Sequence, residues 1–149
     1  MESIANRNNP FKAIVEQLPE RRKFVFKMIQ GNPGISSQDL SGMTLLPINE
    51  ILPRVRELRD IFLVAEDGSK VNKFTNKNNT IYRTLNSVEE RIDLINAEFV
   101  RLRDSKSKLE SDYHLGLTLF TKEIVKKEID KIKSKITSLE KILDVIQAA

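Results

Sequence analysis

Apolar residues recur at alternating spacings of three and four along the second half of the chain. The first run comprises Leu85, Val88, Ile92, Ile95, Phe99, Leu102 and Leu109. The second run is unbroken and comprises Val125, Ile129, Ile132, Ile136, Leu139, Leu143 and Ile146. Spacings that average about 3.5 residues place an apolar stripe on one side of a helix and favour knobs-into-holes pairing. We therefore predict two long amphipathic helices over residues 87–149, with a connector over residues 111–120 around Gly116.

Each of these helices needs a partner, because its apolar stripe would otherwise stay in water. The two can fold back as an antiparallel hairpin, or each can pair with its counterpart in a second chain. Ile124 and Ile142 flank the seam of the second helix and make its stripe wider than one partner covers. This favours a coiled-coil hairpin that also dimerises through the second apolar run. Ser87 with Glu90 indicates a capping box where the first helix begins.

The first half has a different organisation, because all five prolines and four of the five glycines lie before residue 87. After Pro19, the residues with helical spacing are Phe24, Val25, Met28 and Ile29. Glycine and proline within residues 31–34 end this first helix. Ser36 as N-cap with Asp39 three residues later predicts a second helix, which Ser41 and Gly42 keep short.

A third helix is predicted from about Asn49 or Glu50 to about Asp60. Pro53 is costly in a helix interior, so the regular helix should begin only about one turn before it. The expected inner face comprises Ile48, Ile51, Leu52, Val55 and Leu58. The residues left toward the outside are polar or charged, apart from Pro53.

A hairpin is predicted after the third helix. Residues 62–65 form a short apolar run, Asp67 and Gly68 indicate a turn, and residues 80–85 alternate as a strand does. The stretch 69–79 between them contains Lys70, Lys73 and Lys77 together with several asparagines. We interpret this stretch as a flexible, basic wing.

The runs ISSQDL (35–40) and LPINEILPRVRELR (46–59), followed by the basic hairpin, resemble the winged helix-turn-helix family. The resemblance covers residues 19–86 and is strongest to small bacterial and phage members. It implies an α+β domain over residues 1–86, of which 1–18 are an N-terminal extension. With the helical region 87–149 that the apolar spacing predicts, the expected fold is mainly α. The chain departs from the family at Ile61 and Phe62, where a glycine usually occupies a left-handed position.

The resemblance implies binding of double-stranded DNA, with the third helix in the major groove and the wing on the flanking backbone or minor groove. The DNA-contact candidates on this reading are Asn49, Arg54, Arg56, Arg59, Lys70, Lys73 and Lys77. Arginine can contact guanine edges or phosphates, asparagine can read adenine, and lysine supplies charge to phosphates. The alternative is that the arginines pair with acidic residues on a solvated helix face, and Arg59 can instead brace the fold.

Composition adds mostly exclusions. The net charge is +4, and residues 1–86 hold all of it, with 13 basic against nine acidic residues. The chain has no Cys, and its single His (His114) has no catalytic or metal-binding partners evident in the sequence. It also has no phosphate-binding glycine loop and no G-x-S-x-G or H-E-x-x-H motif, so we expect no metal site, no catalytic residues, no cofactor and no enzymatic activity. No apolar run is long enough to span a membrane and the N-terminus has no signal-peptide pattern, so the expected location is the cytoplasm.

Together these features predict a sequence-specific DNA-binding protein, a dimeric transcriptional regulator of bacterial, phage or plasmid type. Two alternatives stay open. One is a phage packaging or replication factor similar to small terminases, which also join a helix-turn-helix domain to an oligomerising region. The other is a module that binds no DNA and bridges protein partners through its coiled coil.

Overall fold

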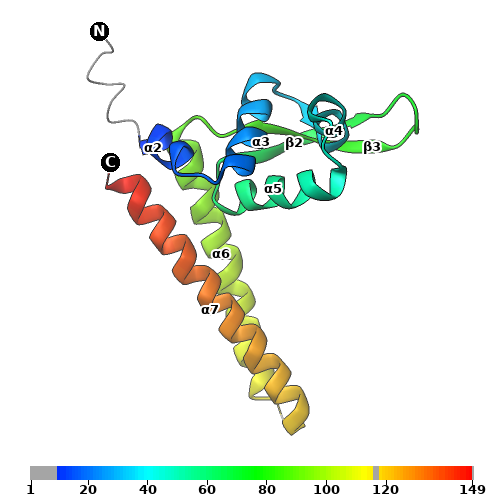
Figure 1. The fold of residues 1–149 in the computed structure, drawn as a ribbon. Helices are drawn as coiled ribbons and strands as arrows, with labels where there is room; N and C mark the ends of the chain where they lie inside the picture. The colour runs from blue at the N-terminus through cyan, green and yellow to red at the C-terminus, as the bar shows by residue number, and fades with distance from the viewer. Residues whose placement is uncertain (1–9, 116–117, 149) are drawn as a thin grey trace. The chain divides into compact units, whose positions relative to one another are not determined.

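The computed structural model describes residues 10–115 and 118–148 (Figure 1). Gly116 and the first nine residues of the N-terminal extension lie outside the described residues. The elements are α2 (Pro10–Glu16), α3 (Glu20–Gly31), β1 (Ile35–Ser36), α4 (Ser37–Thr44), α5 (Ile48–Asp60), β2 (Val64–Val71), β3 (Asn78–Thr84), α6 (Val88–Tyr113) and α7 (Leu119–Gln147). They form two compact units, the first ending at Arg91 and the second beginning at Ile92.

The first unit contains a helix-turn-helix with a small antiparallel sheet, in the strand order β1-β3-β2. Its core is formed by α3, α4 and α5 with the sheet, and Val15 of α2 joins it, so part of the N-terminal extension is helical and packs on the domain. Helix, strand, helix, helix, strand, strand is the order of a winged helix domain. Together with the two long helices that follow, it confirms the predicted fold class.

Helix α4 begins with the predicted capping box. The Ser36 hydroxyl accepts from the backbone N–H of Asp39 at 3.2 Å, and the Asp39 carboxylate accepts from the backbone N–H of Ser36 at 3.0 Å. The predicted stop at Ser41 and Gly42 is wrong, because α4 continues to Thr44. The Thr44 hydroxyl donates to the carbonyl of Leu40 at 2.6 Å, a hydrogen bond within α4 that stabilises its last turn.

Helix α5 begins at Ile48, slightly earlier than predicted, and contains Pro53 in its interior. Its buried residues are Ile51, Val55 and Leu58. Ile48 and Leu52 were expected on this inner face but are 38% and 44% exposed. At about 100° per residue they lie at the edge of the arc that faces the core.

Phe24 on α3 is a similar case. It was expected inside, but it is exposed, and Phe26 is buried in its place. The apolar residues 24–26 are too closely spaced to share one face of a helix, so the core can accept only part of this run.

The exit from α5 uses the left-handed position that the sequence marked as unusual. Phe62 has φ 58°, in the left-handed region that favours glycine. The Arg91 side chain is buried beside this turn, with Nε 2.7 Å from the carbonyl oxygen of Phe62 and a second guanidinium nitrogen 3.4 Å from that of Ile61. Burial lowers the pKa of the Arg91 guanidinium. A buried cation thus binds the carbonyl groups at the end of α5.

The hairpin between β2 and β3 is longer than predicted. Asp67 and Gly68 do not form its turn; they lie within β2, where the register shifts between Glu66 and Ser69 and Gly68 has φ 89°. The chain reverses over residues 72–77 instead. The predicted wing is therefore a paired ribbon with a short tip, which projects beyond the helices (Figure 1).

The start of α6 shows only half of its predicted capping box. The backbone N–H of Glu90 donates to the Ser87 hydroxyl at 3.3 Å. The Glu90 carboxylate pairs with Arg83 on β3 rather than with the N-cap backbone, and this hydrogen bond lowers the pKa of Glu90. The Glu90 carboxylate therefore binds the Arg83 guanidinium and not the backbone N–H of the N-cap.

In the second unit, α6 and α7 form an antiparallel hairpin. Near the connector, the Lys122 ammonium lies 5.4 Å from the centre of the Tyr113 ring. Further along, the pKa of Glu98 is lowered first by its hydrogen bond from Arg101 and also by the charge of Lys135 on α7. The buried apolar residues of the two helices are Ile95, Phe99, Leu102, Ile129, Leu139 and Ile146. The two long helices and their hairpin are as predicted.

Candidate nucleic-acid interface

The outward face of α5 lies opposite its buried line. Asn49, Pro53, Arg56 and Asp60 are all exposed, and their spacings of four, three and four residues place them on one face. Asn49 and Arg56 are two of the predicted DNA-contact residues. The stripe offers one amide and one guanidinium to a partner, with a single carboxylate at its C-terminal end.

Arg56 is the arginine of α5 for which no ion pair forms among the described residues. Arg54 differs, because its guanidinium donates to both carboxylate oxygens of Glu57 at 2.8 and 2.7 Å. Arg22 on α3 binds the same carboxylate at 2.8 Å. Glu57 therefore holds Arg54 on the side of α5 that faces α3, away from the outward stripe.

Arg59 also has an acidic partner. Its guanidinium lies 2.7 Å from the carboxylate of Glu66 on β2, and both side chains are about half exposed. This pair corresponds to the alternative in which Arg59 braces the fold. An exposed pair of this kind contributes only about 0–1 kcal/mol, so a phosphate could replace Glu66 as the partner of Arg59 at small cost.

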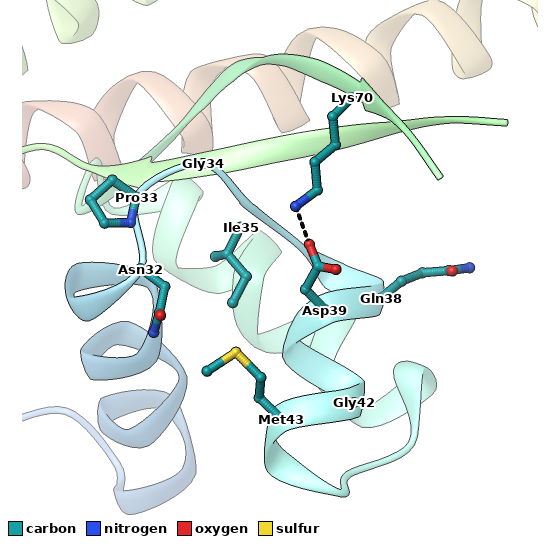
Figure 2. Close-up of a pocket in the computed structure, with 9 residues that line it drawn as sticks. All are labelled: Asn32, Pro33, Gly34, Ile35, Gln38, Asp39, Gly42, Met43 and Lys70. Atoms are coloured by element: carbon teal, nitrogen blue, oxygen red, sulfur yellow. Dashed lines mark ion pairs between the residues drawn. The ribbon is translucent and has the colours of Figure 1, made fainter. Parts of the chain in front are cut away.

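The wing is attached to the first turn of α4 close to the wing tip, where β2 ends. The Lys70 ammonium forms an ion pair with Asp39, the same carboxylate that completes the capping box (Figure 2). One position beyond β2, the Asn72 amide donates to the Gln38 side chain at 2.7 Å. The hydrogen bond from Lys70 holds the pKa of Asp39 below its usual range, aided by Ser36 and opposed by partial burial. Of the three predicted wing lysines, Lys70 is the one already paired.

The tip of the wing carries the other two predicted lysines. Lys73 and Lys77 are exposed, and the described residues supply no acidic partner for either. Between them lies Phe74, whose side chain is 99% exposed. Phe74 could not be singled out from the sequence, because a single aromatic residue in a polar loop gives no periodic signal.

A shallow depression of about 500 Å³ lies between the C-terminal end of α3, β1 and α4 (Figure 2). Ile35 and Met43 supply apolar surface, and Asp39 and Lys70 lie at its edge as a closed ion pair. A ligand site usually combines an apolar pocket with convergent free polar groups. With its charged pair already satisfied, this depression is better described as part of the attachment of the wing.

Other kinds of site find little support in residues 10–115 and 118–148. These residues contain no cluster of three or more His, Asp or Glu side chains that could hold a metal ion. His114 is exposed, and the centre of its ring lies 5.7 Å from the centre of the Tyr113 ring. No helix in this part of the chain has the length and apolar character to cross a membrane.

Comparison with known proteins finds similarity to solved structures. No family model matches the sequence, and no curated protein matches it. The chain is similar to the crystal structure of Bacillus subtilis PadR in complex with operator DNA, at 13% sequence identity. The match covers 86% of this chain and 99% of that chain, with a TM-score of 0.37. At a TM-score this low, no property of that protein transfers to this one.

Proposed function

We propose that this chain is a sequence-specific double-stranded DNA-binding protein that acts as a dimeric transcriptional regulator. One observation carries the proposal: of the six predicted DNA-contact cations, the three without an acidic partner among the described residues lie on the outward face of α5 (Arg56) and at the tip of the wing (Lys73 and Lys77). A winged helix presents these two surfaces to neighbouring grooves of a duplex. The proposal assigns the chain no catalytic step and no cofactor.

The two surfaces have different chemical roles. Arg56 can donate two parallel hydrogen bonds to guanine, and Asn49 can donate to N7 of adenine while accepting from its N6 amino group, so α5 reads base edges in the major groove. Lys73 and Lys77 are flexible point charges that neutralise phosphates whatever the sequence. The α5 face therefore supplies specificity and the wing supplies affinity.

The paired cations contribute less. When Arg54, Arg59 or Lys70 moves to a phosphate it gives up an internal carboxylate, so the exchange gains little net charge. The salt dependence of binding should therefore follow the unpaired cations, with a slope of about 0.9 per phosphate neutralised. Per subunit, we therefore expect about three phosphate contacts, from the unpaired cations, rather than six from all the candidate cations.

Dimerisation through α7 is supported by the seam that the hairpin covers only in part. Ile129, Leu139 and Ile146 are buried, whereas Val125, Ile132, Ile136 and Leu143 keep intermediate exposure. A second copy packed along α7 would cover these four residues. Two-fold pairing would present two α5 helices to half-sites about one turn of DNA apart, so we expect a palindromic site.

The test is a salt titration of binding to a specific and a scrambled duplex. Arg56→Ala should cost about 1–3 kcal/mol on the specific duplex and relax the base preference at one position per half-site. A Lys73→Ala, Lys77→Ala double variant should weaken binding to both duplexes alike and lower the salt slope by about two per subunit.

Arg101→Ala is the matched control. Arg101 is an exposed arginine on α6, paired with Glu98, so its loss changes the net charge as Arg56→Ala does without touching the proposed interface. If Arg56→Ala and the lysine double variant bind both duplexes as the control does, DNA binding through this face is refuted. The module that bridges protein partners then becomes the better explanation.

A further inference from the structure

Phe74 is the most exposed of the large apolar side chains in the described residues, at 99%. Isolated apolar side chains on a surface are ordinary and usually need no explanation. This one lies in the turn of residues 72–77, at the tip of a hairpin that projects from the domain (Figure 1). Its position, rather than its exposure alone, calls for a function.

The turn beneath Phe74 is well ordered by its own hydrogen bonds. The Asn72 side-chain oxygen accepts from the backbone N–H groups of Phe74 at 2.8 Å and Thr75 at 3.3 Å. The Asn72 backbone donates to the carbonyl of Lys77 and accepts from the N–H of Asn76, both at 2.8 Å. One residue thus makes four bonds across the tip. The backbone under the aromatic ring is preorganised, which reduces the entropy lost when the ring is buried by a partner.

The charges around the ring point to a polyanion. Lys73 precedes Phe74, Lys77 follows the turn, and the stretch 72–77 contains no acidic residue. Both lysines are without acidic partners among the described residues. An apolar ring between two free cations suits a partner that combines phosphates with an apolar interior, and stacked base pairs have that combination.

We propose that Phe74 is a wedge that inserts between two stacked base pairs in the minor groove of duplex DNA, while Lys73 and Lys77 bind the flanking phosphates. This inference rests on the proposed DNA-binding function and goes beyond it. Apolar side chains inserted in this way unstack the base step and kink the duplex by about 20–90° toward the major groove.

The wedge would add a second kind of sequence preference. A phenyl ring has no hydrogen-bond donor or acceptor, so it cannot distinguish base edges. It selects instead for steps that unstack easily, which are the pyrimidine–purine steps TA and CA/TG. The site should therefore carry such a step beside each α5 half-site, at positions that Arg56 and Asn49 never touch.

The experiment uses duplexes selected from a random-sequence pool by the full chain. A fluorescent adenine analogue, whose emission rises on unstacking, is placed at successive positions of the selected duplex, and energy transfer between the duplex ends reports bending. With the parent chain, we expect one position per half-site to brighten and the ends to approach. Phe74→Ala should abolish both signals and weaken binding about tenfold, within the range measured for base–aromatic stacking.

Two further variants separate the wedge from general effects on the tip. Phe74→Leu should keep most of the brightening and bending, because leucine also serves as a wedge. Thr75→Ala is the matched control: its backbone N–H still reaches Asn72, so it should behave as the parent. Phe74 is fully exposed, so its replacement should leave the fold intact, which circular dichroism checks.

The outcomes distinguish the wedge from the underlying function. If the parent selects a duplex but neither brightens nor bends it, or if Phe74→Ala matches the parent in both signals, the wedge is wrong and DNA binding stands. If the parent selects no duplex from the pool, the proposed function and the wedge fail together.

Discussion

Replacing Arg91 should destabilise the first unit more than any exposed arginine would. Arg91 is 2% exposed, and its Nε donates to the carbonyl of Phe62 at 2.7 Å, at the left-handed residue that ends α5. Arg91→Met keeps most of the apolar length of the side chain and removes its donors. The variant therefore tests the hydrogen bonds rather than the packing.

The magnitude follows from two opposing effects. A hydrogen bond from a charged donor contributes about 1.5–3 kcal/mol, and an unsatisfied buried carbonyl costs a similar amount. The contact with Ile61 is 3.4 Å long and adds little. Against this loss, methionine has no buried charge, so the desolvation that lowers the pKa of the Arg91 guanidinium disappears. We expect a net loss of about 2 kcal/mol in the free energy of unfolding.

The assay is urea denaturation followed by circular dichroism, with Arg101→Met as the control. Arg101 is also on α6, but its side chain is 61% exposed and its partner Glu98 is three residues away on the same helix. Such a pair contributes about 0.3–0.5 kcal/mol. Equal midpoints for Arg91→Met and Arg101→Met would refute the view that Arg91 stabilises the end of α5.

Two other predictions concern assembly and acid. The double variant Ile132→Lys, Ile136→Lys places two charges in the α7 seam, so sedimentation should show monomer or unfolding. An unchanged oligomer would exclude α7 from self-association. In the same measurement, a parent assembly of eight or more subunits would favour a packaging factor over a dimeric regulator. Asp39→Asn should be less stable than the parent at neutral pH, because Lys70 holds the Asp39 pKa low and the carboxylate therefore stabilises the fold at every pH above its usual value of about 3.9. The gap should close as the pH falls through the lowered pKa, and an equal gap at pH 7 and in strong acid would contradict this.

Local signals allowed the sequence to predict much of the fold. The capping box of Ser36 and Asp39 spans three residues, so the sequence contains both partners of the interaction. The resemblance to the winged helix-turn-helix family placed a left-handed residue at Ile61 or Phe62, and Phe62 has a positive φ. The seams of α6 and α7 repeat over many residues, and such long periodic patterns are the strongest signal for a helix.

Features that depend on distant partners could not be predicted. Asp67 and Gly68 indicate a positive φ, which a hairpin turn and a β-bulge both require, and only pairing with β3 decides between them. Arg54 has Glu57 within reach on its own helix, but Arg22, which shares that carboxylate, comes from α3. Residue type alone could therefore name the candidate cations without showing which of them are already neutralised.

The carboxylate of Asp39 closes the first turn of α4 and also anchors Lys70 near the end of β2. A local element and a long-range one therefore share a single charged group. Losing that contact removes a helix cap and a strand attachment in one event, so the N-terminal turn of α4 and the wing belong to one cooperative unit of opening. Amide protons in these two segments, more than thirty residues apart for Gln38 and Asn72, should exchange with solvent through a common fluctuation.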